Sequence, residues 1–156
     1  MTVMEIIDFE PQFAEAFRTL NEAWITRYFT LEDKDRQILG DPVGQIIARG
    51  GSILFAVEGQ TPVGCVALIP MADGGAELAK MAVDPASHGR GCAKALMSAC
   101  VARARETGAH RLYLETHSSL APAIGLYRAT GFTDVPADCA PPSPYARCDV
   151  RMELAL

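Results

Sequence analysis

Residues 77–104 read ELAKMAVDPASHGRGCAKALMSACVARA, and this stretch decides the fold. The apolar run Ala76 to Val83 predicts a β-strand, and the apolar stripe that begins at Ala93 predicts a helix lying on the sheet. Gly89 and Gly91 predict a tight loop between the two. A strand, a glycine loop and a helix in this order point backbone N–H groups at whatever lies over the helix N-terminus, which suits a phosphate. The stretch therefore predicts an anionic ligand.

Two common phosphate-binding patterns fit this loop poorly. A Walker loop needs a hydroxyl residue after its lysine, but Lys94 is followed by Ala95. The dinucleotide pattern G-x-G-x-x-G has its first two glycines at Gly89 and Gly91, but Lys94 takes the third place. Glu115 matches the acid that binds a ribose, so a nucleotide-dependent oxidoreductase stays open as a weaker alternative.

A third pattern fits better. The hexapeptide at 88–93, HGRGCA, resembles [Q/R]-x-x-G-x-[G/A], the pyrophosphate loop of the GNAT superfamily of acetyl-CoA-dependent N-acetyltransferases. Glycines let the backbone approach a bulky pyrophosphate, and the helix start and nearby cations offset its charge. The first residue of the loop departs from the pattern. The resemblance implies that the coenzyme pyrophosphate is bound by His88, Gly89, Arg90, Gly91, Cys92, Ala93 and Lys94.

A second motif lies downstream. Arg111 to Thr116 reads as a strand, and Ser119 to Thr130 as a helix with Ser119 as its cap and Gly131 after its last turn. Residues 120–132, LAPAIGLYRATGF, resemble the GNAT pattern N-x-x-A-x-x-L-Y-x-x-x-G-F, with Leu120 in place of Asn. The combined resemblance covers the chain from about Leu54 to its C-terminus.

The resemblance implies an α/β (α+β) fold, with a mixed, mainly antiparallel sheet that is splayed where the coenzyme enters and has helices on both faces. It implies one GNAT-type domain over residues 1–156. Acetyl-CoA is the expected co-substrate, with its pantetheine arm along Met81, Ala82 and Val83 and the thioester oxygen against a backbone N–H near Met81. The expected reaction is direct acetyl transfer to a primary amine on a small molecule or a peptide. A non-catalytic acyl-CoA-binding or sensor module is the alternative.

Two residues take the expected catalytic roles. Glu77 matches the general base of one branch of the family. The alternative is that Glu77 is a solvated acid near a turn and that water acts as the base. A regular strand places Glu77, Ala79, Met81 and Val83 on one face, whereas a bulge changes this parity. Tyr127 matches the tyrosine that protonates the coenzyme thiolate, or it packs on the sheet.

Other polar residues are weaker candidates. His117 is a further candidate base just past a strand. Cys92 lies where a thiolate is favoured, but a nucleophilic role is the weaker reading. The candidate residues for the acceptor pocket are Trp24, Tyr28, Tyr145, Arg147 and Asp149.

Composition narrows the class of protein. The chain has 156 residues, 49% of them hydrophobic, which suits one domain with a real core. Five cysteines without a C-x-x-C pair argue against a disulfide framework and a zinc site, so no metal is expected. A net charge of −5 argues against nucleic acid as a partner. No signal peptide or membrane span is evident, so a cytoplasmic location is expected. Dimers are common in families that look like this one, and a homodimer is open.

Local patterns predict the remaining elements. A helix is expected from about Pro11, and a second from Thr30 with Asp33 completing a capping box. The other expected segments are strands at Val3 to Phe9, Ser52 to Val57, Val63 to Ile69 and Arg147 to Leu154, and a Pro-rich loop at Pro136 to Pro144.

Overall fold

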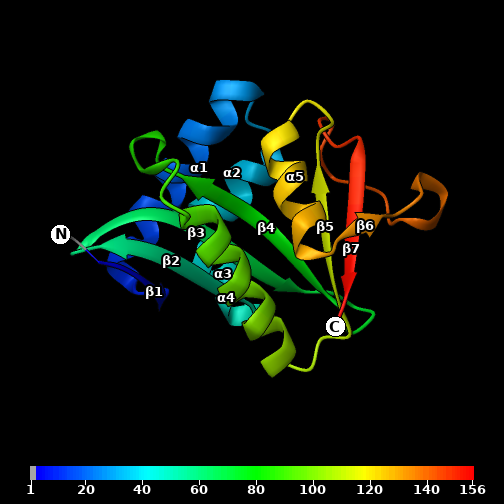
Figure 1. The fold of residues 1–156 in the computed structure, drawn as a ribbon, viewed down its shortest axis with the longest axis horizontal. Coiled ribbons are helices and arrows are strands. Elements are labelled where there is room, and N and C mark those ends of the chain that lie inside the picture. Colours follow the sequence, from blue (N-terminus) through cyan, green and yellow to red (C-terminus); the bar gives the residue numbers. More distant parts are fainter. Residues whose placement is uncertain (1–2) are drawn as a thin grey trace.

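The structure is a computed structural model that describes residues 3–156. A seven-stranded sheet with the strand order β1-β2-β3-β4-β5-β7-β6 runs through the molecule (Figure 1). The strands are β1 (Met4–Asp8), β2 (Ser52–Glu58), β3 (Thr61–Pro70), β4 (Ala76–Val83), β5 (Arg111–Thr116), β6 (Thr133–Asp134) and β7 (Val150–Ala155). The helices are α1 (Ala14–Tyr28), α2 (Asp33–Gly40), α3 (Pro42–Gln45), α4 (Cys92–Glu106) and α5 (Ala121–Thr130). Short 3-10 turns lie at Pro11–Phe13, Ile47–Arg49, Pro85–Ser87 and Ala137–Cys139.

The junction between β4 and β5 is the one parallel pairing in this sheet; the other neighbouring strands within residues 3–156 are antiparallel. Only Ala76 with Leu112 and Glu77 with Tyr113 are in register across it. Beyond these pairs the strands diverge (Figure 1). The mixed, mainly antiparallel splayed sheet is therefore confirmed. The oxidoreductase alternative requires a doubly wound parallel sheet, so that alternative is wrong.

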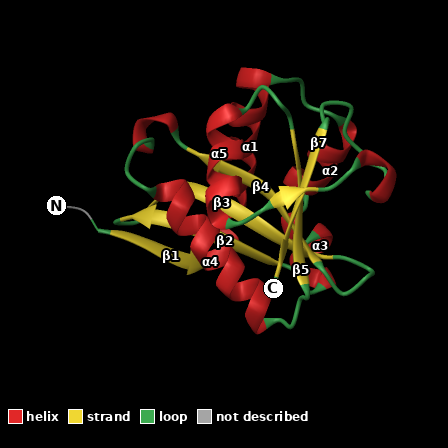
Figure 2. Cartoon of the chain, turned by 45° about the vertical axis from the view of Figure 1, so that its right-hand side comes forward, coloured by secondary structure: helices red, strands yellow, loops and turns green. Residues whose placement is uncertain are grey.

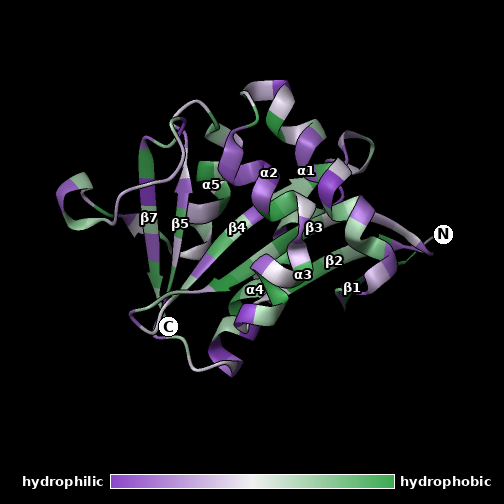
Figure 3. Ribbon diagram, turned by 180° about the vertical axis from the view of Figure 1, so that it is seen from behind, coloured by the Kyte–Doolittle hydropathy of each residue, from purple (hydrophilic) through white to green (hydrophobic). Residues whose placement is uncertain are grey.

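Helices cover both faces of the sheet, as expected (Figure 2). One apolar core lies beneath α4 and α5 and contains Leu96, Met97 and Tyr127. The other lies beneath α1 and α2 and contains Phe17, Ile38 and Phe55. The central strands that separate the two cores are largely hydrophobic (Figure 3). Burial on both faces explains why β2 and β3 read as nearly continuous apolar runs.

A bulge interrupts β4. The register with β3 shifts between Cys65 and Ala67, and opposite this point Lys80 has a left-handed φ of 55°. Leu78 packs in the α4-side core, whereas Ala82 packs in the α1-side core. The strand is therefore not regular, and the alternative in which a bulge changes the parity of Glu77, Ala79, Met81 and Val83 is the one observed. Glu77 faces the α1 side, while Met81 and Val83 pack toward the α4 side.

Two helix starts differ from the sequence prediction. The helix expected from Thr30 begins at Asp33, because the capping box is formed by Glu32 and Asp35. The Glu32 carboxylate accepts the Asp35 N–H, and the Asp35 carboxylate accepts the Glu32 N–H at 2.9 Å, whereas Thr30 lies two residues before this cap. At α5 the N-cap residue is Leu120. The Ser119 hydroxyl does not cap this helix, because it is hydrogen-bonded to His117 Nδ1 at 2.7 Å.

Other boundaries agree more closely. The strands at 76–83 and 111–116 have the expected bounds, and Gly131 takes the left-handed conformation after α5, with φ 114°. The last strand begins at Val150 rather than Arg147, because residues 147–149 remain in the loop and turn toward α2 and β5. The short elements α3 and β6 had no clear sequence pattern.

Candidate active site

A cleft of about 780 Å³ opens where β4 and β5 diverge. Its walls come from β4, the loop after it, the start of α4, the end of β5, α5 and the C-terminal half of α1. Among the residues predicted for catalysis and coenzyme binding, those that line this cleft are Glu77, Met81, Ala82, Val83, His88, Gly89, Gly91, Cys92, Ala93, Lys94 and Tyr127. Arg90 does not line it, because its guanidinium donates to Glu58 Oε2 at 2.8 Å.

The N-terminus of α4 has the properties that an anion needs. Gly89 and Gly91 have φ of 82° and 76°, a conformation that glycine adopts without strain. The first helical hydrogen bond runs from the Ala95 N–H to the Gly91 carbonyl at 2.9 Å, so the first-turn N–H groups at 92–94 have no acceptor within residues 3–156. No atom lies within 4 Å of a Cβ built at either glycine. This open cradle of amides fits a pyrophosphate.

His88 and Cys92 serve local structure at this loop. The His88 ring lies with Nε2 3.3 Å from the Val83 carbonyl oxygen, which ties the loop to the end of β4. The Cys92 side chain packs in the α4-side core, and burial raises the pKa of its thiol to about 11. A thiol with this pKa stays protonated near neutral pH, which disfavours it as a nucleophile.

Glu77 lies at the point where the two strands part. Burial and, to a smaller extent, the neighbouring Glu115 carboxylate raise its pKa to about 7 against the opposing effect of Lys80 and Lys34. Glu115 is held in place by hydrogen bonds from the Tyr113 hydroxyl at 2.9 Å and the Ser143 hydroxyl at 2.6 Å. A carboxyl group with a pKa near neutrality is suited to exchange a proton at physiological pH.

Tyr127 approaches the same gap from the opposite face of the sheet. It lies on α5, packs against Phe132 with ring centroids 6.0 Å apart, and is 9% exposed. Burial raises its pKa to about 12, so the hydroxyl keeps its proton across the neutral range. Within residues 3–156 no group hydrogen-bonds to this hydroxyl. Glu77 and Tyr127 thus face one gap from its two sides.

An aromatic row forms the α1 wall of the cleft. Trp24 contacts Tyr28 and Phe29 with centroid distances of 5.4 and 6.4 Å, and Phe29 meets His117 edge-on at 5.2 Å. His117 Nε2 is 3.6 Å from Asp149, which also accepts hydrogen bonds from Ser118. His117 is therefore part of a loop network at the rim, and Asp149 lies outside the lining of the cleft.

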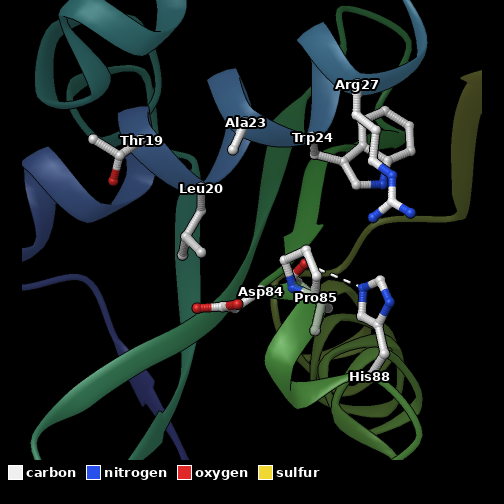
Figure 4. Close-up of a pocket in the computed structure, with 9 residues that line it drawn as sticks. Thr19, Leu20, Ala23, Trp24, Arg27, Asp84, Pro85 and His88 are labelled. Carbon is white, nitrogen blue, oxygen red and sulfur yellow. Dashed lines mark hydrogen bonds between the residues drawn. The ribbon is translucent and has the colours of Figure 1, made fainter.

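A smaller cavity of about 250 Å³ adjoins the cleft and shares Trp24, Val83 and His88 with it. Its walls are α1 and the loop after β4 (Figure 4). The Arg27 side chain extends from α1 toward His88 at this cavity (Figure 4).

Sequence reasoning missed a buried ionic cluster on the α1 side of the cleft. Lys80 Nζ lies 2.5 Å from Asp35 Oδ1 and donates to the Tyr145 hydroxyl at 3.0 Å. Arg147 donates to both carboxylate oxygens of Asp35, at 2.7 and 2.8 Å, and to Glu32 at 3.2 Å. The only local signal was a lysine within an apolar strand. Tyr145 and Arg147, named as pocket candidates, do line the cleft together with Trp24 and Tyr28.

This splayed sheet, with a free helix N-terminus facing its gap, defines an acetyltransferase fold. The sequence model of the "Acetyltransferase (GNAT) family" matches residues 9–132, so the chain belongs to that family. YjgM of Escherichia coli, described as an uncharacterized N-acetyltransferase, is 35% identical over 118 residues, which cover 72% of this chain and 69% of YjgM.

Solved structures share the fold. A GNAT-family acetyltransferase from Staphylococcus aureus superposes with a TM-score of 0.90 at 19% identity, covering 98% of this chain and 99% of that chain. The structure of yncA from Salmonella typhimurium, solved with its cofactor acetyl-CoA, has a TM-score of 0.74 at 20% identity and covers 97% of this chain and 93% of that chain.

Residues 3–156 contain neither a cluster of metal ligands nor a helix able to span a membrane. No group of three or more His, Cys, Asp and Glu side chains there is arranged to hold a metal ion. None of the helices in this part of the chain has the length and apolar character needed to cross a membrane.

Proposed function

We propose that this acetyltransferase moves an acetyl group directly from acetyl-CoA to a primary amine, within a ternary complex. The single observation that carries the proposal is that one cleft contains three groups: the free amides of α4, the Glu77 carboxyl and the Tyr127 hydroxyl. Acetyl-CoA bound to the fold relative yncA supports the choice of donor.

In this proposal the coenzyme and the acceptor approach from opposite faces of the sheet. The pyrophosphate binds at the start of α4, and the pantetheine arm follows Met81 to Val83 into the gap. Between Leu78 and Val83, β4 has no registered partner on β5, so backbone groups there are free to pair with the arm. A backbone N–H near Met81 would receive the carbonyl oxygen as it gains charge. The acceptor enters from the α1 side, where Glu77 faces.

The proton transfers follow from the two pKa shifts. The neutral amine attacks the thioester carbon, and Glu77 as carboxylate takes the proton that the nitrogen loses as the C–N bond forms. The C–S bond breaks, the departing thiolate takes the Tyr127 hydroxyl proton, and exchange with water returns a proton from Glu77 to Tyr127. Because the Glu77 pKa is about 7 and burial keeps Tyr127 protonated, both groups have the required form just above neutral pH.

An acetyl-CoA consumption screen over amine classes tests this function. The panel includes polyamines, amino acids, aminoglycosides, and peptides with a free N-terminus or lysine. Turnover that depends on the amine and falls in Glu77→Gln and Tyr127→Phe is expected. Acetyl-CoA binding without turnover on any amine, at several pH values, would instead support a sensor module.

A further inference from the structure

The buried ionic cluster connects three segments that are distant in the sequence. Asp35 lies on α2, Lys80 at the bulge of β4, and Tyr145 and Arg147 in the loop before β7. The Asp35 side chain is fully buried, and that of Lys80 is 5% exposed. These contacts add polar links between α2, β4 and the loop before β7 to the apolar core that packs α1 and α2 on the sheet.

Lys80 combines this contact with an unusual backbone. It has a φ of 55°, and it is the only non-glycine residue within 3–156 with a positive φ. An L-residue in this conformation is strained unless its surroundings hold it there. The surroundings here are the Asp35 carboxylate and the Tyr145 hydroxyl, which bind the ammonium group. The strain therefore occurs where β4 changes face, between Glu77 and the pantetheine segment.

The Tyr145 ring supports the same arrangement. The Lys80 ammonium lies 4.6 Å from the ring centroid and the Arg147 guanidinium 4.4 Å from it. Two cations that share an aromatic ring and one carboxylate require close charge balance. Within this cluster Glu32 and Asp35 supply two negative charges against the two positive ones.

Charges of the cluster also reach the reacting carboxyl. Lys80 favours the ionised form of Glu77, and so does Lys34, whereas Glu115 disfavours it. Asp35, Arg147 and Tyr145 are the remaining titratable groups that face Lys80. Removal of the Lys80 charge alone would leave an excess negative charge beside Glu77, which raises the pKa of that carboxyl.

We propose that Lys80 is a positioning residue for acetyl transfer: its ammonium, bound to Asp35 and Tyr145, holds the β4 bulge that puts Glu77 and the pantetheine segment on opposite faces of the sheet. This inference rests on the proposed function. Lys80 does not touch the reacting atoms; it sets the position and charge environment of a group that does.

Four variants separate position from folding. Lys80→Met removes the charge, Lys80→Arg keeps a cation, and Tyr145→Phe removes only the hydroxyl while leaving the ring. Arg103→Met is the matched control, because it removes a cation whose partners Asp8, Ser52 and Glu106 lie on β1, β2 and α4, outside the lining of the cleft. For each variant we would measure kcat, the KM for acetyl-CoA, the pH profile of kcat/KM, the melting temperature and the heat of CoA binding.

The expected result for Lys80→Met is a kcat about 10- to 100-fold below the parent, since a small misplacement of a catalytic group has this effect. CoA affinity stays within about threefold, because the pyrophosphate loop is intact. The acid limb of the pH profile is the fall in kcat/KM as Glu77 becomes protonated. This limb moves to higher pH in Lys80→Met and stays in place in Lys80→Arg and Arg103→Met. Tyr145→Phe, which keeps both charges, shows a smaller loss of kcat without a shifted limb.

The two hypotheses fail in different ways. If the parent acetylates amines but folded Lys80→Met keeps the parental kcat and acid limb, the positioning role is wrong and the proposed function stands. If Lys80→Met does not fold, the other two variants decide. The positioning role of Lys80 is wrong if Tyr145→Phe keeps the parental kcat and the acid limb of the pH profile disappears in Lys80→Arg. A parent that binds CoA without acetylating any amine overturns the proposed function itself.

Discussion

Replacement of Glu77 by glutamine gives the sharpest prediction about the chemistry. The carboxyl has a pKa of about 7, so about 10% of it is ionised at pH 6 and about 90% at pH 8. A reaction that needs the carboxylate therefore gains about tenfold between these pH values from this group alone. Glutamine cannot accept the proton, and we expect a loss of about 10²- to 10⁴-fold in kcat at pH 8.

The assay is acetyl-CoA consumption with one active amine, followed from pH 6 to pH 9 for the parent and for Glu77→Gln. The ratio of the two rates removes the contribution of the amine's own protonation, because both proteins use the same acceptor. We expect this ratio to rise about tenfold from pH 6 to pH 8 and then level off. A constant ratio, or a loss below about threefold, would refute the assignment of Glu77 as the base and favour water.

The same substitution, which lowers activity, should raise the stability of the fold. Because the folded-state pKa of Glu77 is raised, the folded protein binds this proton more tightly, and stability falls as pH rises from about 4.5 to about 7. Glu77→Gln removes that penalty, so its free energy of unfolding at pH 8 should exceed the parental value by about 3 kcal/mol, and by much less near pH 4. Urea unfolding at both pH values measures the difference, and it also shows that lost activity is not lost folding.

Other substitutions probe the remaining groups. Asp35→Asn leaves two buried cations without their shared carboxylate and should destabilise the fold by about 3–5 kcal/mol in urea unfolding at pH 7; a loss below 1 kcal/mol would contradict the account of the cluster. The Asp35 pKa is lowered to about 2 against burial by hydrogen bonds from Arg147 and Lys80, so this stability is lost as pH falls from about 4 toward 2. Tyr127→Phe should lower kcat about 10- to 100-fold with an unchanged KM for acetyl-CoA, and unchanged turnover across pH would remove its role as the acid. Gly91→Ala places a Cβ at φ 76° and should weaken CoA binding about tenfold by calorimetry, whereas parental affinity would show that the loop needs no glycine there.

Much of the fold could be predicted because its signals are local. Gly89 and Gly91 occupy left-handed positions, which the residue type alone can indicate. The strand at 76–83 is indicated by the apolar residues within it. Gly131 ends α5 for the same local reason. These elements also carry the two motifs from which the family was identified, and the family match confirms that identification.

The rest of the site depends on contacts between distant residues. Asp35 looks like an ordinary first-turn acid, and only the fold brings it to Lys80 and Arg147, 45 and 112 residues further along the chain. Arg90 resembles a phosphate-binding cation, but its side chain meets Glu58 of β2 instead. The face to which Glu77 points was undetermined for a related reason, because the bulge forms through pairing with β3.

The most direct test of the central claim compares the binding of acetyl-CoA with that of acetyl-pantetheine, which lacks the diphosphate and the nucleotide. Isothermal titration of the parent protein with each compound gives the two dissociation constants. A cradle of free amides at the start of α4 predicts that acetyl-CoA binds at least about 100-fold more tightly. Equal affinities, or no heat with acetyl-CoA on well-folded protein, would contradict the claim that this loop binds the coenzyme.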